Sequence, residues 1–395
     1  MNSRFESAGA LLTIDLAALC DNWRALRARL GRATCGAVLK ADAYGLGAAR
    51  VAPALAQAGC KQFFVAHLDE AIALRAAVPA DAAIHVLHGP IPGSEAEFVA
   101  HGVVPVLNSL QQIEGWAALA ARLGRRLPAF VQVDTCMARL GLSAAELAVA
   151  AADPSRLAGV DLTCVMSHLA CAEAQGHEAN AAQLARFVAA RRRLPPAPAS
   201  LANSAGIFLG PDYHFDLARP GAALYGIAPM DGVSNPMRRV VRLQGKVMQV
   251  RELEPGNPVG YGHSWRCATR ARIATVSVGY ADGYLRALSS RGSAWLDDVE
   301  LPIVCKASMD TITLDVSSLP YGALPPGTLV DLIGDRQDVD AVAANAGTIG
   351  YEVLTNLGSR YARHYIGVAP LIETWQDRRG RGATRRHQQE ATSFQ

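Results

Sequence analysis

Several features that would place this chain in a membrane, in a secretory pathway or in a zinc-binding class are missing from its sequence. No apolar run reaches the roughly 20 residues of a transmembrane helix. At the N-terminus, Glu6 and Asp15 interrupt any apolar segment of the kind a secretion signal needs. The eight cysteines form no CxxC pair, and several lie in apolar runs, where a free thiol acts as a small hydrophobe. We therefore expect a cytoplasmic protein with no membrane partner and no metal site.

An excess of charge of one sign is also missing. The net charge of the 395 residues is +3. Residues 377–395 carry five arginines against Asp377 and Glu390, which is +3 by itself, so the rest of the chain is neutral. A neutral body lacks the basic footprint of a nucleic-acid-binding protein, and we expect no nucleic-acid partner. The arginine-rich segment is polar and has no apolar face, which predicts a disordered tail over residues 377–395.

Lysine is the scarcer basic residue, and only four of the 38 basic residues are lysines: Lys40, Lys61, Lys246 and Lys306. Lys40 ends the apolar run Cys35–Leu39, which predicts a buried strand followed by a turn and a helix. The carboxyl ends of strands are where α/β folds place their chemistry. Burial lowers the pKa of an amine, which can then act as a nucleophile, unlike a guanidinium. Lys40 is therefore a candidate catalytic residue, with a lysine that only ends a strand as the alternative.

The hydrophobic pattern divides the chain into two domains. Up to about residue 228, short apolar runs alternate with helical patterns, which is close to what a (β/α)₈ TIM-type barrel needs. An open, doubly wound sheet is the alternative. After residue 229, alternating β-branched runs predict a mostly β domain. We therefore expect a barrel over residues 11–228 and a β-rich domain over residues 229–376. The expected barrel strands are Cys35–Leu39, Phe63–His67, Ile84–Leu87, Val103–Leu107, Ala129–Val133, Leu162–His168, Ser200–Asn203 and Phe215–Ala218.

The stretch Val38–Gly47, VLKADAYGLG, resembles the cofactor-attachment motif of the alanine racemases, which are fold type III pyridoxal-phosphate enzymes. The resemblance places Lys40 in the Schiff-base position for pyridoxal 5'-phosphate, and it implies that Tyr44 contacts this cofactor. It runs in order from about Leu11 to Gly367. It implies a barrel followed by a mostly β domain, and interconversion of L-alanine and D-alanine that supplies D-alanine for peptidoglycan.

Two stretches after the seventh and eighth expected strands match cofactor contacts of this family. In Asn203-Ser204 and Gly221-Ala222, Ser204 and the amides of Gly221 and Ala222 match phosphate contacts, and Asn203 is a further cofactor-binding candidate. A hydroxyl with backbone N–H groups at a helix start suits an anion. An ordinary helix cap is the alternative for the first pair. Arg219 matches the arginine that hydrogen-bonds the pyridine nitrogen, and because a guanidinium stays protonated, the ring would remain a weaker electron sink. The other residues that match the cofactor site are His168 and Tyr351.

The resemblance also implies a second acid/base and substrate contacts. Tyr261 matches the family's second catalytic base, so Lys40 and Tyr261 would flank the two faces of the substrate Cα. Arg139 and Met309 match substrate-binding residues, and Tyr280 matches a residue of the inner entry path.

Two positions depart from the family pattern near the substrate. Gln132 stands where many members have a carbamylated lysine that orients the arginine matched by Arg139. Cys136 replaces a glycine in the motif D-T-G-M-x-R-L-G. Both departures bear on substrate affinity more than on the type of reaction.

The resemblance further implies a homodimer with shared active sites, in which the β domain of one subunit covers the barrel of its partner. Two alternatives stay open beside an alanine racemase of cell-wall synthesis, and the sequence argues against two others. One is a racemase with serine or broader amino-acid specificity, and another is a catabolic alanine racemase. A decarboxylase of the same architecture would carry an E-P-G-R motif where this chain has Arg219-Pro220-Gly221. A single-domain cofactor carrier would lack the β domain and Tyr261.

Overall fold

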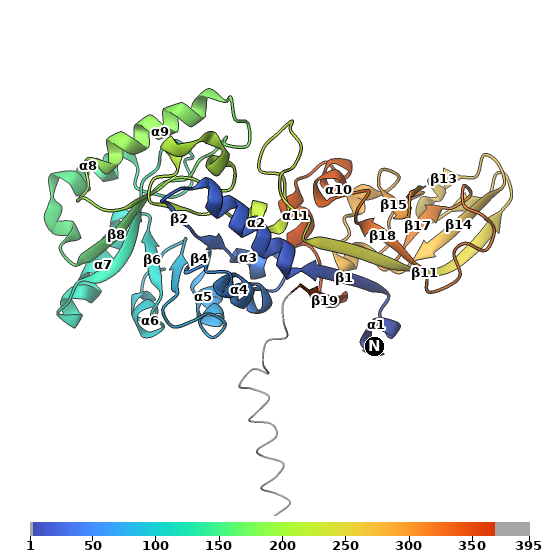
Figure 1. The fold of residues 1–395 in the computed structure, drawn as a ribbon, viewed down its shortest axis with the longest axis horizontal. Coiled ribbons are helices and arrows are strands. Elements are labelled where there is room, and N and C mark those ends of the chain that lie inside the picture. The colour runs from blue at the N-terminus through green and yellow to red at the C-terminus, as the bar shows by residue number, and fades with distance from the viewer. Residues whose placement is uncertain (1–2, 368–395) are drawn as a thin grey trace, which may run out of the picture.

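The computed structural model describes residues 3–367, and its first large part is a ring of short parallel strands (Figure 1). Strands β3 to β9 pair in chain order. The ring closes because β10 pairs in parallel with β2 and because the N–H groups of Asp216 and Arg219 donate to the carbonyls of Ala199 and Ala202 at 3.0 and 2.9 Å. The predicted barrel is therefore confirmed. Its strands are β2 (Thr34–Cys35), β3 (Ala37–Val38), β4 (Gln62–Val65), β5 (Ala83–Val86), β6 (Val104–Leu107), β7 (Leu127–Gln132), β8 (Val160–Met166), β9 (Ala199–Ser200) and β10 (Leu217–Ala218).

Helices cover the outside of this ring, and the residues that precede them explain where they begin. The side chains of Asp15 and Ser109 accept N–H groups of the first turns of two helices, which is the usual role of an N-cap residue. Ser143 and Glu146 form a reciprocal capping box at a third. The helices are α2 (Leu16–Arg29), α4 (Ala48–Gln57), α5 (Leu68–Arg75), α6 (Glu95–Ala100), α7 (Leu110–Leu123), α8 (Ala144–Ala152) and α9 (Glu178–Arg191).

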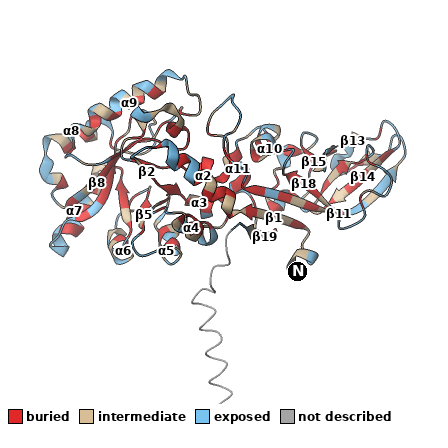
Figure 2. Ribbon diagram, viewed as in Figure 1, coloured by how far each residue is buried: buried red, intermediate tan, exposed pale blue. Residues whose placement is uncertain are grey.

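The second part is mostly β, as predicted. Its main sheet has the strand order β16-β15-β18-β11-β1-β19, and β14 pairs with both β11 and β17. A separate two-stranded hairpin, β12 with β13, lies next to β14 and β17 at one end of this part (Figure 1). Figure 2 shows buried residues along the strands of both parts. The elements are β11 (Val241–Leu253), β12 (Pro258–Val259), β13 (Trp265–Arg266), β14 (Ala271–Val276), β15 (Ser293–Leu296), β16 (Val299–Pro302), β17 (Ile312–Asp315), β18 (Leu329–Ile333), α10 (Val339–Ala346), α11 (Gly350–Thr355) and β19 (Ala362–Ile366).

The first strand, β1 (Ala10–Asp15), belongs to the second part and not to the barrel. It pairs antiparallel with β11 and parallel with β19, and a short helix, α1 (Ser3–Ser7), precedes it. The burial of its residues alternates, as in a strand with one face on the core: Leu12 and Ile14 are fully buried, while the residues on either side of them are not. The domain boundaries 11–228 and 229–376 stay a proposal. Residues 11–15, at the start of the first proposed domain, belong to β1 and pair with strands of the β sheet. The tail predicted over residues 377–395 lies outside the described residues.

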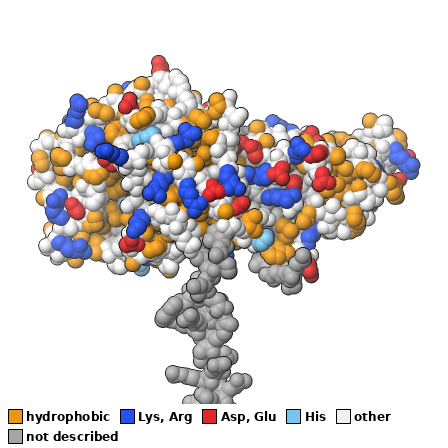
Figure 3. All heavy atoms as spheres, in the orientation of Figure 1, with side chains coloured by type: hydrophobic (Ala, Val, Ile, Leu, Met, Phe, Trp, Pro, Cys, Tyr) orange, Lys and Arg blue, Asp and Glu red, His pale blue; other side chains and the backbone are white. Residues whose placement is uncertain are grey.

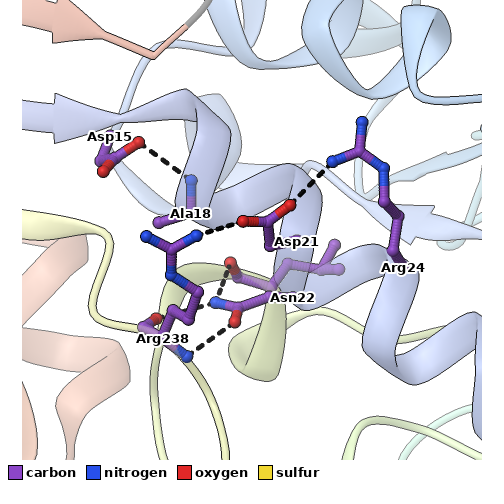
Figure 4. Close-up of polar contacts among 7 residues, drawn as sticks. Asp15, Ala18, Asp21, Asn22, Arg24 and Arg238 are labelled. Atoms are coloured by element: carbon purple, nitrogen blue, oxygen red, sulfur yellow. Dashed lines mark hydrogen bonds and ion pairs between the residues drawn. The ribbon is translucent and has the colours of Figure 1, made fainter.

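The segment between the two parts is fastened to the helix that follows β1 (Figure 4). The buried amide of Asn22 donates to the carbonyls of Leu224 and Arg238 at 3.2 and 2.8 Å, and its oxygen accepts the N–H of Arg238 at 2.7 Å. The guanidinium of Arg238 also pairs with Asp21. Side chains of both charge signs lie next to one another where the two parts meet (Figure 3). No helix within residues 3–367 combines the length and the apolar character that a membrane crossing requires.

Candidate active site

Lys40 begins a short left-handed turn, α3 (Lys40–Tyr44), directly after the first barrel strand. Ala41, Asp42 and Ala43 have φ between 53 and 56° and ψ between 49 and 52°, and Tyr44 has a φ of 55°. Residues other than glycine normally visit this region singly, at a cost of about 1–2 kcal/mol each. A polar turn is predicted here, but its handedness is not visible in the sequence. Four consecutive left-handed residues require support from the surrounding structure.

The carboxylate of Glu70, in the first turn of α5, supplies much of that support. It accepts the N–H of Ala41 at 2.6 Å and the N–H groups of Ala66 and His67 at 2.7 and 3.0 Å. Within the turn, the Asp42 carboxylate accepts the N–H of Ala48 at 2.7 Å. These bonds fix the backbone on both sides of Lys40. Glu70 has no place among the predicted site residues, although its position three residues after the N-cap of α5 is a visible signal.

The environment of Lys40 favours a neutral amine. Burial and then the positive charge of Arg139 lower the pKa of Lys40, while Glu70 acts in the opposite direction. A neutral amine is the form that can attack a carbonyl group. Burial and Arg139 thus shift the pKa of Lys40 in the direction that a nucleophilic amine requires, and the catalytic role of Lys40 stays a prediction.

Charge changes at Arg139 and Glu70 should move the pKa of Lys40 in opposite directions. Arg139→Gln removes a charge that lowers this pKa, so the pH midpoint for uptake of pyridoxal phosphate by cofactor-free protein should rise. Glu70→Gln removes a charge that raises the pKa, so the midpoint should fall. Stopped-flow absorbance across a pH series measures both midpoints. Shifts of the same sign in the two variants would contradict this electrostatic account.

A compact group of residues, which we call the cradle, lies next to this turn. It consists of Ser204, Gly221 and Tyr44. The hydroxyl of Ser204 accepts the N–H of Gly221 at 2.9 Å and the N–H of Ala223 at 3.2 Å. A Cβ atom at residue 221 would lie 2.3 Å from the Tyr44 hydroxyl, so only glycine allows this approach. Ala222 begins the 3-10 turn Ala222–Tyr225, where N–H groups have no acceptor within the turn. Hydroxyls and N–H groups at the start of a helical turn fit a phosphate group.

Aromatic rings close the cradle. The Tyr44 ring stacks on that of Tyr225 at 4.5 Å and lies 6.0 Å from that of Tyr351. Burial and the nearby Tyr351 raise the pKa of Tyr44, so its hydroxyl remains a hydrogen-bond donor. Asn203 uses its side-chain oxygen locally, accepting the N–H of Gly206 at 2.8 Å. This is the capping alternative, and a cofactor contact of Asn203 stays a prediction.

Arg219 and His168 lie together just after the carboxyl ends of β10 and β8. Arg219 is 3% exposed, and its guanidinium donates to the carbonyl of Ser167 at 2.6 Å and to the hydroxyl of Ser200. One of its nitrogens lies 3.5 Å from Nδ1 of His168. Burial lowers the pKa of Arg219 to about 10, and burial together with Arg219, Arg139 and Lys40 lowers the pKa of His168 to about 3. Near neutral pH, a charged guanidinium therefore faces a neutral imidazole.

The two departures from the family pattern lie at the end of β7, which is Gln132, and in the following loop, which carries Cys136 and Arg139. Cys136 has a φ of 85°, and the Asp134 carboxylate accepts the N–H groups of Cys136 and Met137 at 3.0 and 2.9 Å. The amide of Gln132 donates to the carbonyl of Leu140 at 3.0 Å. Gln132 thus holds the backbone next to Arg139 and does not bond its guanidinium. The side chain of Arg139 is exposed, which leaves it free to meet an anionic group.

Cys136→Gly should stabilise the protein because glycine adopts a φ of 85° without the penalty that a Cβ atom brings. We expect the free energy of unfolding to rise by about 1 kcal/mol. Urea unfolding followed by circular dichroism measures it. Cys171→Gly is the matched control, because φ is not positive at Cys171 and a glycine there should leave stability unchanged or lower it. Equal effects in the two variants would show that the strained φ costs nothing.

The second group of predicted site residues lies elsewhere in the chain. Tyr261 and Met309 are 71% and 54% exposed, and Tyr280 is 41% exposed. Tyr261 begins the turn of the β12–β13 hairpin. In Figure 1, β13 lies at the end of the β part remote from α3, which begins at Lys40. One chain therefore brings together Lys40, Tyr44, Arg139, His168, Ser204, Arg219, Gly221, Ala222 and Tyr351, and it leaves the hairpin of Tyr261 outside this site.

Two histidines near Lys40 are absent from the sequence-based prediction. His67 and His88 follow strands β4 and β5, and their rings meet edge to face at 4.6 Å. Burial, His67 and Lys40 lower the pKa of His88. Their shared signal in the sequence is a histidine two residues after the end of each of two neighbouring strands.

A closed parallel barrel with a lysine at the carboxyl end of its first strand, a phosphate-sized cradle and a separate β part defines the class of two-domain pyridoxal-phosphate enzymes. Residues 14–229 match the family model described as alanine racemase, N-terminal domain, and residues 240–365 match the one described as alanine racemase, C-terminal domain. The chain belongs to the alanine racemase family of isomerases.

Known members of the family support this over nearly the whole chain. The catabolic alanine racemase of Mesorhizobium japonicum is 54% identical over 361 residues, covering 91% of this chain and 94% of that protein. The alanine racemase of Brucella canis is 51% identical over 380 residues, covering 93% and 96%. The crystal structure of alanine racemase from Bartonella henselae, with covalently bound pyridoxal phosphate, has a TM-score of 0.88 at 42% identity and covers 91% and 100%.

Proposed function

We propose that this protein interconverts L-alanine and D-alanine with pyridoxal phosphate bound covalently through Lys40. The observation that carries the proposal is the placement of Lys40, with its lowered pKa, on a fixed left-handed turn beside the Ser204–Gly221 cradle and the buried Arg219. The bound cofactor would supply the electron-withdrawing group that makes the α-proton of an amino acid acidic.

The residues of one chain would each contact a different part of that cofactor. Ser204 and the N–H groups of Gly221 and Ala222 would bind the phosphate, with Tyr44 and Tyr351 closing over it. Arg219 would donate a hydrogen bond to the ring nitrogen without protonating it, because its pKa of about 10 still lies well above neutrality. His168, neutral at this pH, would contact the same ring. Arg139 would bind the substrate carboxylate.

Racemisation requires a base on each face of the substrate Cα. Lys40 occupies one face, and we assign the other to Tyr261. Tyr261 would take the α-proton of L-alanine and Lys40 that of D-alanine, with the other residue returning a proton in each direction. Such acid–base catalysis contributes roughly 10²–10⁴ in rate for each group.

The exposure of Tyr261 and Met309 supports a homodimer with shared active sites. Both residues are more than half exposed in one chain, and the hairpin of Tyr261 lies far from Lys40 (Figure 1). A second copy whose β part covers the barrel would bring Tyr261 and Met309 of the partner to Lys40. Sedimentation across a concentration series tests the dimer, and a monomer with full activity would overturn the shared site.

The physiological role has two candidates. Supply of D-alanine for peptidoglycan is the first, and use of D-alanine as a nutrient is the second, which the relative from Mesorhizobium japonicum favours because that enzyme is catabolic. Substrate breadth beyond alanine, with serine first, is a further proposal that rests on Gln132 and Cys136. We also propose a cytoplasmic location, in keeping with eight cysteines that are all free thiols.

The test uses purified protein with pyridoxal phosphate and L-alanine in heavy water, following D-alanine and deuterium at Cα together. D-alanine that carries deuterium supports racemisation through bases that exchange with solvent. Exchange without D-alanine would leave one base at work and reject the assignment of the second. If alanine neither exchanges nor racemises, alanine is not the substrate, and a panel of amino acids that begins with serine follows.

A further inference from the structure

Arg360 joins two aspartates that belong to different turns of the β part. Its Nε donates to Oδ1 of Asp282 at 2.5 Å, and a terminal nitrogen donates to Oδ1 of Asp310 at 2.7 Å. The side chain of Asp282 is 8% exposed, whereas those of Arg360 and Asp310 are 50% and 61% exposed. A planar guanidinium can serve two carboxylates at once with fixed geometry, which a lysine ammonium cannot do as well.

Asp282 closes the turn that carries Tyr280, and Asp310 belongs to the turn that carries Met309. Oδ2 of Asp282 accepts the N–H of Gly279 at 2.8 Å and so closes the turn Tyr280–Asp282. Asp310 directly follows Met309 in the sequence.

The two turns also contact each other through their backbones. The N–H of Tyr280 donates to the carbonyl of Ser308 at 3.0 Å, and the N–H of Ala281 donates to that of Met309 at 2.9 Å. A Cβ atom at residue 279 would lie 2.2 Å from the Met309 carbonyl oxygen, so the two backbones pack without room for a side chain. The turns of Tyr280 and Met309 therefore form one rigid unit, which Arg360 clamps from the side.

The same unit is tied to the cofactor turn of its own barrel. The N–H of Gly358 donates to the carbonyl of Asp282 at 2.9 Å. Arg363 donates to the carbonyls of Leu357 and Gly358 at 3.3 and 3.4 Å and to the carbonyl of Gly45, which ends the turn of Lys40, at 2.7 Å. Arg363 thus links residues 357–358 to the turn of Lys40, and Arg360 links the turns of Tyr280 and Met309 to each other.

We propose that Arg360 is a positioning residue for substrate binding, holding Met309 and Tyr280 in the geometry that the partner's active site uses. This inference rests on the proposed function, in which Met309 contacts the substrate. Arg360 touches neither cofactor nor substrate itself. The ion pair between Arg360 and Asp310 is exposed and adds little stability in water. Loss of this ion pair should therefore change the position of the Met309 turn more than the stability of the fold.

The experiment compares Arg360→Gln and Arg360→Lys with the matched control Arg336→Gln. Arg336 also pairs with an exposed aspartate of the β part, Asp298, which lies between β15 and β16 and not in the turns of Tyr280 and Met309. For Arg360→Gln we expect KM for alanine to rise about 10-fold, because small misplacements of contact groups are costly in rate and binding. We expect kcat to change less than KM, and the absorbance of bound cofactor to stay unchanged, since Arg363 remains. Arg360→Lys should recover only part of the KM.

Unchanged KM in Arg360→Gln relative to Arg336→Gln would overturn the inference. If Arg360→Gln does not fold, Asp310→Asn removes only the exposed arm of the clamp and should raise KM by a smaller factor, and an unchanged KM there counts equally against the inference. Absence of racemase activity in the wild-type protein would instead reject the proposed function, so the two failures are distinguishable.

Mixed dimers show which site Arg360 serves. When Lys40→Ala and Arg360→Gln share one chain and the other chain is wild type, the working site uses the altered turn, and KM should rise. When the two substitutions lie on different chains, the working site uses an unaltered turn, and KM should stay normal. Equal KM in both arrangements would overturn the positioning role. A rise only in the second arrangement would keep Arg360 as a positioning residue but reject the shared site.

Discussion

Lys40→Ala is expected to abolish racemisation, with a loss of at least about 10⁴-fold in kcat, because the residue is proposed to bind the cofactor covalently and to act as one of the two bases. Two of the other lysines are engaged elsewhere: Lys61 pairs with Asp81, and Lys246 donates to carbonyls of residues 5 and 6. The fourth, Lys306, lies in the β part next to Gly262. A chiral assay of alanine measures the loss, and the absorbance of lysine-bound cofactor should disappear with it.

Lys61→Ala is the matched control, since it removes an exposed lysine at the opposite end of a barrel strand and should keep both activity and absorbance. Circular dichroism should show that both variants are folded. A Lys40→Ala protein that retained the absorbance of lysine-bound cofactor and full activity would overturn the assignment of the site. Partial recovery by an added small amine would support the base function separately from cofactor attachment.

Tyr261→Phe is expected to lower racemisation by roughly 10²–10⁴-fold, since it removes one acid/base group and keeps the ring. The loss should depend on the direction of proton transfer. With Lys40 intact, D-alanine in heavy water should still exchange its α-proton while retaining its configuration, whereas exchange from L-alanine should nearly stop. Proton NMR of each enantiomer distinguishes these cases.

Tyr321→Phe is the control for this experiment, because Tyr321 lies in the same β part and is 84% exposed. It should behave as wild type. If Tyr261→Phe lost exchange from both enantiomers equally, Tyr261 would be a positioning residue and not one of two opposed bases. If it lost nothing, the second base would have to be sought among other groups near Lys40, with His67 and His88 first.

The barrel and the β sheet were predictable because their strands carry strong local signals. Apolar runs of four to seven residues ending at Lys40 or Arg219 mark both the strand and the end at which chemistry is placed. The exposed position of Tyr261 could not be predicted, because hydrophobic periodicity reports which residues are buried in one chain and says nothing about a second copy.

Other features depend on contacts between residues distant in sequence. The left-handed turn after Lys40 is one example, since its support comes from the Glu70 carboxylate in the next helix. The use of the Ser204 hydroxyl is another, because it caps no helix of its own and accepts N–H groups from the turn after the next strand. Gln132, expected near Arg139, bonds the backbone instead, which only the folded loop reveals.

The pairing of β1 with β19 has a consequence for how the protein is made. Leu11 lies beside Ala362 in a parallel ladder, so almost the entire chain must leave the ribosome before β1 finds this neighbour. The barrel, with strands that pair in chain order, can form earlier. During synthesis, β1 can already pair with β11, but its other edge stays open until β19 emerges, and an unpaired strand edge is a place where wrong pairing starts.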